Sequence, residues 1–341
     1  MKKYLSIVLL TVVSSCYGQL DKVMPYAQNI EQEDLKKLLY VYASDYFQGR
    51  ESGELGQKRA VTFLREFYQQ HGIAPADGTE DYFQKMTLDV KGKQIATENV
   101  VAIIPGKSKP NEYVVISSHL DHEGIKNGKI YNGADDDGSG TIAQLRIAQA
   151  FQQAANEGNA PERSVVFLHF TGEEKGLLGS KYYADNPLYP IEQTVVDLNI
   201  DMIGRIDPTH KGKDERYIYI IGSSHLSSDL HELSERVNKK TLNLSLDYKY
   251  NEIDEPECIY YRSDHYNFAK NNIPVIFYFN GVHEDYHKPT DTPEKIEYEL
   301  YTERTQLIFY TAWELANGKR IKVDKSLENI SLVNCKRYIN R

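Results

Sequence analysis

Three consecutive aspartates stand among glycines at residues 132–140, where the chain reads Asn-Gly-Ala-Asp-Asp-Asp-Gly-Ser-Gly. Like charges this close repel one another, so the carboxylates of Asp135, Asp136 and Asp137 require solvent, a basic partner or a metal ion beside them. Taken alone, the run is typical of a solvated acidic turn. Its flanks favour chemistry instead, because an apolar strand ending in His119 precedes it and helical spacing begins directly after it. The loop therefore lies where an open α/β sheet binds its ligands.

Acidic and histidine side chains also follow four apolar runs along the chain. The runs with their following residues are Val114–Ser118 with His119, Asp121 and His122, Val165–Phe170 with Glu173 and Glu174, Val195–Ile200 with Asp201, and Val275–Phe279 with His283, Glu284, Asp285 and His287. Each group alone is typical of a loop or of a helix start, where the dipole favours acids. The carboxyl ends of parallel strands share one edge of a sheet, so together the four groups predict a single site there.

The donor atoms at these strand ends indicate which metal would bind. Imidazole and carboxylate groups without a thiolate suit a hydrolytic zinc centre better than a structural one, which favours cysteine. The carboxylates suffice for two Zn²⁺, because Asp135, Glu174 and Asp201 with one hydroxide would neutralise both ions. His119 and His287 are the neutral donors. One carboxylate must then bridge the two ions, and we expect the glycine-flanked Asp135 to do so.

The elements that hold these side chains follow an α/β pattern. Strands are expected at Asn99–Ile104, Tyr113–Ser118, Ser164–Phe170, Val195–Ile200, Tyr217–Ile221 and Pro274–Phe279. Helices are expected at Gln28–Tyr42, Gly56–His71, Ser139 to about Ala155, Ser227–Lys239 and Thr302–Ala316. The strands lack polar alternation and are therefore covered on both faces. The sequence predicts an α/β fold with a mainly parallel, mixed central sheet sandwiched by helices.

The first 18 residues have the composition of an export signal. A basic start precedes the apolar run Leu5–Val13, which is too short to span a bilayer. Two cleavage sites remain open. Val13-Ser14-Ser15-Cys16 resembles a bacterial lipobox, which would leave a membrane-anchoring lipid on Cys16, whereas Cys16-Tyr17-Gly18 fits ordinary cleavage. We expect an exported, periplasmic or extracellular protein in which residues 19–341 form a single catalytic domain.

Charge and cysteine content narrow the classes of partner. Forty basic residues, less the two in the leader, stand against 49 acidic ones and leave a formal charge of −11. This balance argues against binding to nucleic acid or to an anionic membrane surface.

Two cysteines lie well inside the mature chain, Cys258 and Cys335. Export permits a disulfide between them, and one buried thiol with one exposed thiol is the alternative that the sequence leaves open.

At these residues the sequence resembles the zinc-dependent exopeptidases that include bacterial leucyl aminopeptidases. Relatives with the same fold include glutamate carboxypeptidases, glutaminyl cyclases and the transferrin-receptor ectodomain. The resemblance extends from Ala43-Ser44-Asp45-Tyr46-Phe47-Gln48-Gly49-Arg50 to Pro289-Thr290-Asp291-Thr292 and implies the zinc-exopeptidase fold. The interval from Tyr82 to Thr97 has no room for the protease-associated domain that is inserted in some larger relatives.

The resemblance implies a role in metal binding for each strand-end ligand. His119 and Asp201 correspond to the ligands of one zinc ion. Glu174 and His287 correspond to the ligands of the other ion, and Asp135 corresponds to the bridging aspartate. In the family the peptide bond after the bridge is cis, which places it directly after Asp135. The implied cofactor is a pair of Zn²⁺ ions.

Two further acidic residues match roles in catalysis. Glu173 resembles the general base, and Asp121 resembles the acid that orients the imidazole of His119. The segment Arg262-Ser263-Asp264-His265 also matches the family, and support of the ligands, a pocket wall and plain packing remain open for it. The resemblance implies an aminopeptidase in which a water bridging two zinc ions attacks the first peptide bond of peptides with a free N-terminus. A glutaminyl cyclase on one zinc and a non-catalytic, receptor-like module are the alternatives.

Overall fold

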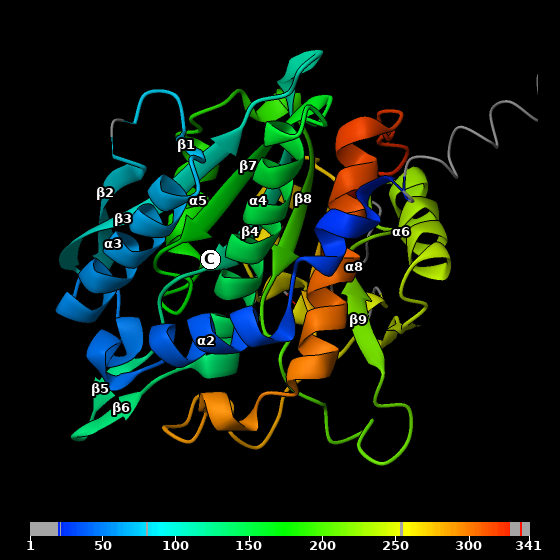
Figure 1. The fold of residues 1–341 in the computed structure, drawn as a ribbon. Helices are drawn as coiled ribbons and strands as arrows, with labels where there is room; N and C mark the ends of the chain where they lie inside the picture. Colours follow the sequence, from blue (N-terminus) through cyan, green and yellow to red (C-terminus); the bar gives the residue numbers. More distant parts are fainter. Residues whose placement is uncertain (1–19, 21, 80, 253–254, 328–334, 336–341) are drawn as a thin grey trace, which may run out of the picture.

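A nine-stranded sheet organises the computed structural model, which describes residues 20, 22–79, 81–252, 255–327 and 335. In sheet order the strands are β1 (Ala74–Pro75), β3 (Lys93–Ile104), β7 (Arg163–Phe170), β4 (Lys109–His119), β8 (Thr194–Ile200), β11 (Val275–Phe279), β9 (Tyr217–Ile221) and β10 (Ser245–Asp247), and β2 (Phe83–Val90) pairs with β3 (Figure 1). The predicted leader, with Cys16, lies outside the described residues.

The four central strands β7, β4, β8 and β11 run parallel to one another, as the sequence predicts. Every residue of β7, β8 and β11 is buried, because these strands are covered on both faces. Antiparallel pairs flank this centre, since β3 pairs with β7 on one side and β9 pairs with β11 on the other. The sheet is therefore mixed, with a parallel centre.

Two hairpins add to the predicted strands. β3 begins six residues before the predicted start at Asn99 and forms a long hairpin with β2. Buried and solvent-facing positions alternate along β2, so it lacks the continuous apolar run on which the strand prediction relied. A separate hairpin joins β5 (Gly124–Lys126) to β6 (Lys129–Tyr131), between β4 and the acidic loop.

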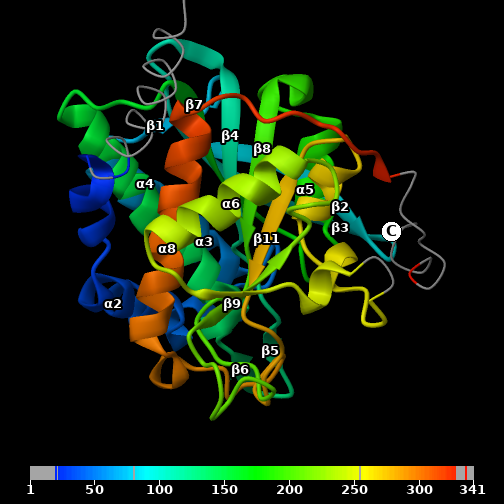
Figure 2. The ribbon, with the colours of Figure 1, turned by 90° about the vertical axis from the view of Figure 1, so that its right-hand side faces the viewer.

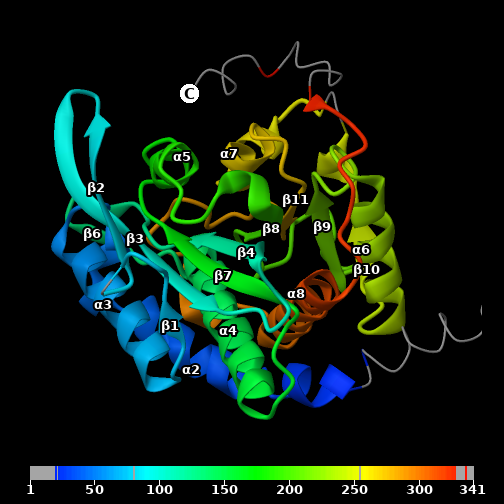
Figure 3. The same cartoon turned by 90° about the horizontal axis from the view of Figure 1, so that it is seen from above.

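Helices cover both faces of the sheet (Figure 3). One face carries α2 (Gln32–Tyr42), α3 (Leu55–Gln70), α4 (Gly140–Asn156), α6 (Ser228–Lys240) and α8 (Tyr298–Asn317), and α6 packs against α8 near β9 (Figure 2). The other face carries the short helices α5 (Leu178–Asp185) and α7 (His265–Ala269), in which too few turns repeat to give a helical period in the sequence. α2 begins later than predicted because a turn at Asn29 and a bend at Ile30 precede it.

The register of the central strands brings their carboxyl ends to one edge of the sheet. Ser118 of β4 lies opposite His169 of β7, and Ile200 of β8 lies opposite Tyr278 of β11. The loops after these strands therefore begin side by side. The acidic loop, which precedes α4, meets them at the same edge.

Cys258 and Cys335 form a disulfide, with Cα atoms 5.7 Å apart and a sequence separation of 77. Of the two arrangements that the sequence leaves open, the structure therefore has the covalent one. The bond ties the segment before α7 to the C-terminal part of the chain. Among the described residues, no helix is both long and apolar enough to cross a membrane.

Candidate metal centre

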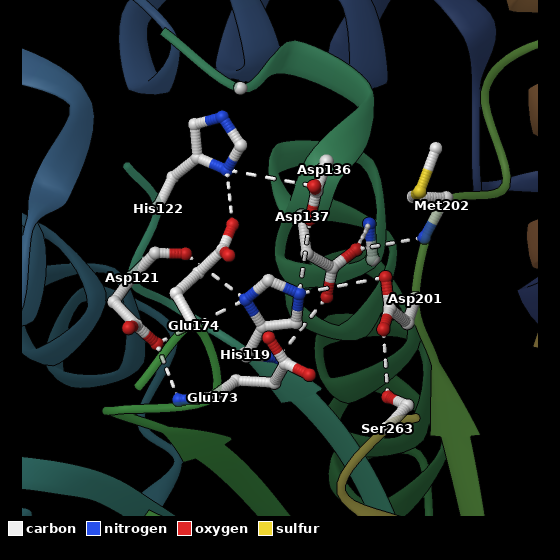
Figure 4. Close-up of polar contacts among 12 residues, drawn as sticks. His119, Asp121, His122, Asp136, Asp137, Glu173, Glu174, Asp201, Met202 and Ser263 are labelled. Carbon is white, nitrogen blue, oxygen red and sulfur yellow. Dashed lines mark hydrogen bonds and ion pairs between the residues drawn. The ribbon is translucent and has the colours of Figure 1, made fainter. Parts of the chain in front are cut away.

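Loops at the carboxyl edge of the sheet bring acidic and histidine side chains into one cluster (Figure 4). Its members are His119, His122, Glu123, Asp136, Asp137, Glu173, Glu174, Asp201 and His287. The side chain of His287 is 36% exposed, whereas those of His119 and Glu174 are 1% and 5% exposed. Carboxylates buried in such number are costly unless positive charge lies among them.

Asp136 lies between two groups of donors. Its Oδ1 atom is 3.2 Å from Nε2 of His119, which is itself 3.5 Å from Oδ1 of Asp201. Its Oδ2 atom is 3.1 Å from Nε2 of His287, which is 3.3 Å from Oε2 of Glu174. The pairs predicted from the sequence, His119 with Asp201 and Glu174 with His287, are therefore brought together. One carboxylate joins them.

The prediction that Asp135 is this shared carboxylate is wrong. Oδ1 of Asp135 accepts hydrogen bonds from the Gly204 amide at 2.7 Å and from the Ser139 hydroxyl at 3.0 Å, and Oδ2 lies 3.1 Å from Nε2 of His283. The side chain therefore points away from His119 and His287. The cis peptide bond also falls one residue later than predicted, at Asp136–Asp137.

Asp291 sets which aspartate faces the centre. Its carboxylate accepts hydrogen bonds from the backbone N–H groups of Asp135 and Asp136, at distances of 3.0 to 3.1 Å. These bonds fix the orientation of the backbone at the middle of the acidic loop. Asp291 is 156 residues away from Asp135 in sequence, so local sequence alone did not reveal this contact.

Asp137 lies near His119 and Asp201, but backbone amides occupy its carboxylate. Oδ1 accepts from the N–H groups of Gly140 and Met202 at 2.9 and 3.1 Å, and Oδ2 accepts from the N–H of His119 at 3.1 Å. The side chain thus joins the ends of β4 and β8 to the start of α4. We assign Asp137 to holding these elements together rather than to binding an ion.

Asp121 contacts the expected neighbour through a different atom. Nδ1 of His119 is 3.0 Å from the backbone oxygen of Asp121 and 4.0 Å from its carboxylate, so the backbone oxygen rather than the predicted carboxylate orients the ring. The carboxylate is drawn away because it accepts hydrogen bonds from the Ser52 hydroxyl at 2.8 Å and from the Glu173 amide at 3.2 Å. It therefore fixes the loop that carries Glu173.

The adjacent residues Glu173 and Glu174 face different neighbours. Glu174 points toward His122 and His287, whereas Glu173 lines an open cavity with His119 and Asp201. Burial raises the pKa of Glu173 well above its ordinary value, an effect that His119 opposes and Asp201 strengthens. Burial also raises the pKa of Glu174, and the charge of Asp136 adds to that shift. Cations bound in the cluster would reverse these shifts.

One wall of the cavity beside Glu173 is apolar. Its side chains are Met202, Ile259, Phe277, Phe279, Val282 and Tyr286, and Arg262 also lines the cavity. The ring of Tyr286 stacks on that of His287, with centroids 3.9 Å apart. The cavity therefore offers a charged end at the cluster and an apolar end beside it.

The segment from Arg262 to His265 divides among its residues the three roles that the sequence left open. Ser263 donates a hydrogen bond to Oδ2 of Asp201 at 2.7 Å and accepts one from Asn199 at 2.8 Å, so it supports the Asp201 carboxylate. Arg262 lines the cavity. His265 is packing, since its ring stacks on Phe277 with centroids 4.7 Å apart.

Buried atoms without hydrogen-bond partners gather at the centre. Within the described residues, Oδ2 of Asp136, Oε1 of Glu174 and both ring nitrogens of His122 have no such partner. Burial lowers the pKa of His122 to about 3, so its ring is neutral. Unpaired oxygens beside neutral imidazole nitrogens fit a bound cation, whose absence would leave them costly to bury. His122 belongs to the strand-end group that the sequence predicts, but it was not predicted as a metal ligand.

Comparisons with known proteins identify the family. A family model described as peptidase family M28 matches residues 99–312. A probable leucine aminopeptidase of Trichophyton verrucosum is 31% identical over 286 residues, covering 75% of this chain and 68% of that protein. Leucine aminopeptidase 1 of Trichoderma harzianum is 28% identical over 286 residues, covering 81% of this chain and 65% of that protein.

Solved structures share the fold at lower identity. The LapA aminopeptidase of Legionella pneumophila has a TM-score of 0.68 at 18% identity, covering 88% of this chain and 74% of that one. The zinc aminopeptidase BSAP of Bacillus subtilis has a TM-score of 0.65 at 15% identity, covering 89% and 99%. The glutaminyl cyclase of Porphyromonas gingivalis has a TM-score of 0.65 at 16% identity, covering 82% and 97%. The family match confirms the resemblance of the motifs, and the chain belongs to peptidase family M28.

Proposed function

We propose that this M28 peptidase is an aminopeptidase that holds two zinc ions at the metal centre. The observation that carries the proposal is the carboxylate of Asp136, whose two oxygens face two separate groups of donors. His119 and Asp201 would hold one ion. Glu174 and His287 would hold the other, and Asp136 would be shared. This arrangement supports the two-metal form of hydrolytic catalysis.

The residues present fit zinc by chemistry and by burial. The donors are imidazole and carboxylate, which suit a hydrolytic zinc site. Oδ2 of Asp136 and Oε1 of Glu174 are buried without hydrogen-bond partners among the described residues, so a cation would satisfy them. When bound, zinc supplies a water of lowered pKa and an electrophile for the scissile carbonyl.

Glu173 is the residue that we assign to proton transfer. Its side chain lines the same cavity as His119 and Asp201, and the hydrogen bond from its amide to Asp121 holds its backbone in place. In the proposed mechanism the carboxylate takes a proton from the attacking water. It then delivers that proton to the amine of the leaving peptide. Hydrolysis requires both transfers, because the water loses a proton when it attacks and the amine gains one when it leaves.

The apolar wall of the cavity supports a substrate class. Met202, Phe279 and Val282 lie beside the charged end, within reach of a residue bound at Glu173. An apolar side chain of the N-terminal residue would be removed from water there, at a gain of roughly 25 cal/mol per Å². Peptides with a free N-terminus and an apolar first residue are therefore the proposed substrates. The aminopeptidases among the relatives are named for leucine.

We also propose that the protein is exported. The basic start and the apolar run Leu5–Val13 support a cleaved leader. The disulfide between Cys258 and Cys335 supports an oxidising compartment, because cytosolic thiols are kept reduced. Mass spectrometry of mature protein distinguishes a start at Gln19 from a lipid-modified Cys16, and intact protein that retains Met1 would contradict export.

The direct test of function combines metal analysis with a substrate panel. Purified protein should contain two zinc equivalents and release nitroaniline from aminoacyl-nitroanilides, fastest for leucine and other large apolar residues. An N-acetylated leucyl substrate is the matched control and should not be cleaved. Protein that holds one zinc and converts an N-terminal glutamine to pyroglutamate would instead be a glutaminyl cyclase, and protein without metal or activity would favour a receptor-like module.

A further inference from the structure

His122 is a buried histidine whose position the assignments above do not explain. It lies in the loop after β4, three residues beyond His119, which ends that strand, and its side chain is fully buried. Nδ1 lies 2.8 Å from Oε1 of Glu174 and 3.7 Å from Oδ2 of Asp136 (Figure 4). These atoms belong to the two carboxylates that the proposed function assigns to the second ion. His122 therefore adjoins that ion's position.

The short contact to Glu174 is not a hydrogen bond. Nδ1 of His122 and Oε1 of Glu174 are 2.8 Å apart, yet neither atom has a hydrogen-bond partner within the described chain. The angle at the contact therefore does not suit an N–H pointing at the oxygen. Oδ2 of Asp136 is unpartnered in the same sense. Three buried acceptor atoms that lie within 4.8 Å of one another without bonding together fit a common cation between them.

The loop around His122 holds its ring in place. Gly133 adopts a left-handed φ of 55°, and a Cβ atom there would lie 2.5 Å from Cγ and Cδ2 of His122. Its backbone therefore lies against the ring, closer than any other residue type would allow. The guanidinium of Arg50 fixes this backbone by donating to the oxygens of Gly133 at 2.9 Å and Asn132 at 2.7 Å. A ring held this firmly is preorganised for a single contact.

From this geometry we infer that His122 is a protein ligand of the second ion, together with Asp136, Glu174 and His287. The inference rests on the proposed two-zinc function. With His122 as a ligand, the two ions differ in their number of protein ligands. The second ion has four, whereas the first has three, His119, Asp136 and Asp201. Zinc sites with four protein ligands are closed, whereas sites with three keep a position for water or substrate.

The residues that line the cavity also distinguish the two ion positions. All three ligands of the first ion line it, namely His119, Asp136 and Asp201, whereas only Asp136 and His287 of the second ion's four ligands do so. The first ion would therefore carry the open position that faces substrate. The second ion would dissociate more slowly, so chelation should remove the two ions in separate steps.

The test is to count imidazole ligands by zinc X-ray absorption on the wild-type protein with two zinc ions bound. Three histidines on two ions give a mean of about 1.5 imidazoles per zinc, and His119 with His287 alone give about 1. The His122→Ala variant should fall to about 1 and should lose affinity for one zinc ion by at least about 10–100-fold in a competition titration. His225→Ala removes another buried histidine, far from the cluster in the fold, and should change neither readout.

The outcomes separate this inference from the function on which it rests. Wild-type protein with two zinc ions and a mean of 1 imidazole per zinc would overturn the role of His122 and leave the aminopeptidase proposal intact. Protein that binds no zinc would overturn both. Because the count is made on the wild-type chain, the result does not depend on whether the His122→Ala variant folds. Thermal unfolding of the metal-free variants checks that point separately.

Discussion

Two Asp–His clusters of similar composition lie next to each other at the edge of the sheet. In one, Oδ2 of Asp135 is 3.1 Å from Nε2 of His283. In the other, Oδ2 of Asp136 is 3.1 Å from Nε2 of His287. The distance between carboxylate and imidazole is therefore the same, and it does not indicate which cluster binds an ion.

The two clusters differ in how their remaining polar atoms are satisfied. Around Asp135 the amide of Gly204, the hydroxyl of Ser139 and the ring of His283 complete the hydrogen bonds of the carboxylate. Around Asp136, in the described chain, one carboxylate oxygen is buried without a partner, as are Oε1 of Glu174 and the nitrogens of His122. A satisfied cluster serves the fold, whereas an unsatisfied one points to a ligand.

The largest expected effect is that of removing the shared carboxylate charge. Asp136→Asn keeps the shape of the side chain but weakens both proposed zinc positions, so zinc content should fall below two per chain. Activity should drop further than the roughly 10²–10⁴-fold typical of a lost general base. Metal analysis and kcat/KM on leucyl-nitroanilide measure both. A variant that kept two zinc ions and wild-type activity would remove Asp136 from the centre.

Glu173→Gln should separate proton transfer from metal binding. The amide cannot accept the proton, so kcat should fall by roughly 10²–10⁴-fold while zinc content and KM stay near wild type. Glu174→Gln is the matched variant one residue away and should lower zinc content along with activity. Normal kcat in Glu173→Gln would contradict its role as base, and loss of zinc from that variant would mean that the roles of the two glutamates are exchanged.

Ser263→Ala should have an intermediate effect, which is confined to zinc affinity at the position of the first ion. It removes the 2.7 Å hydrogen bond to Asp201, a ligand of the first ion in our proposal. Loss of such a supporting contact typically weakens metal affinity by about 10–100-fold. Ser164→Ala is the control, because it removes hydrogen bonds of a buried serine in the same sheet, to Gly106 and Pro110, and leaves those of Asn199 and Asp201 in place. Equal zinc affinities in the two variants would argue against the support by Ser263.

The smallest expected effect on activity is that of Asp135→Asn, in the satisfied cluster. Zinc content and kcat should stay near wild type, because its carboxylate faces Gly204 and His283 instead of the ligands. The free energy of unfolding should fall by roughly 1–3 kcal/mol, since a buried charged partner of His283 is lost. Urea unfolding of the zinc-free protein measures that change. A loss of both zinc ions would return the bridge to Asp135.

The sequence predicted the strands of the parallel centre because burial on both faces leaves a continuous apolar run, as in Val165–Phe170. The half-exposed β2 and the short α5 and α7 lack a comparable pattern. The same strand ends also placed His119, Glu174, Asp201 and His287 at one site, since parallel strands end at a common edge.

The strand-end pattern did not show which of the adjacent aspartates faces the metal centre. Asp135 and Asp136 have the same chemistry and neighbouring positions, and the difference between them comes from Asp291 and Gly204, which are distant in sequence. The role of the Asp121 carboxylate likewise depends on Ser52, which folding brings beside it. Hydrogen bonds over long sequence separations are therefore where the sequence was least informative.

The measurement that tests the central claim most directly is a crystal structure of the zinc-loaded protein with anomalous scattering data at the zinc edge. Two peaks are predicted, one beside His119 and Asp201 and the other beside Glu174 and His287, with the two oxygens of Asp136 contacting one ion each. A single peak would contradict the two-zinc centre. Two peaks joined by the carboxylate of Asp135 would contradict the assignment of the bridge.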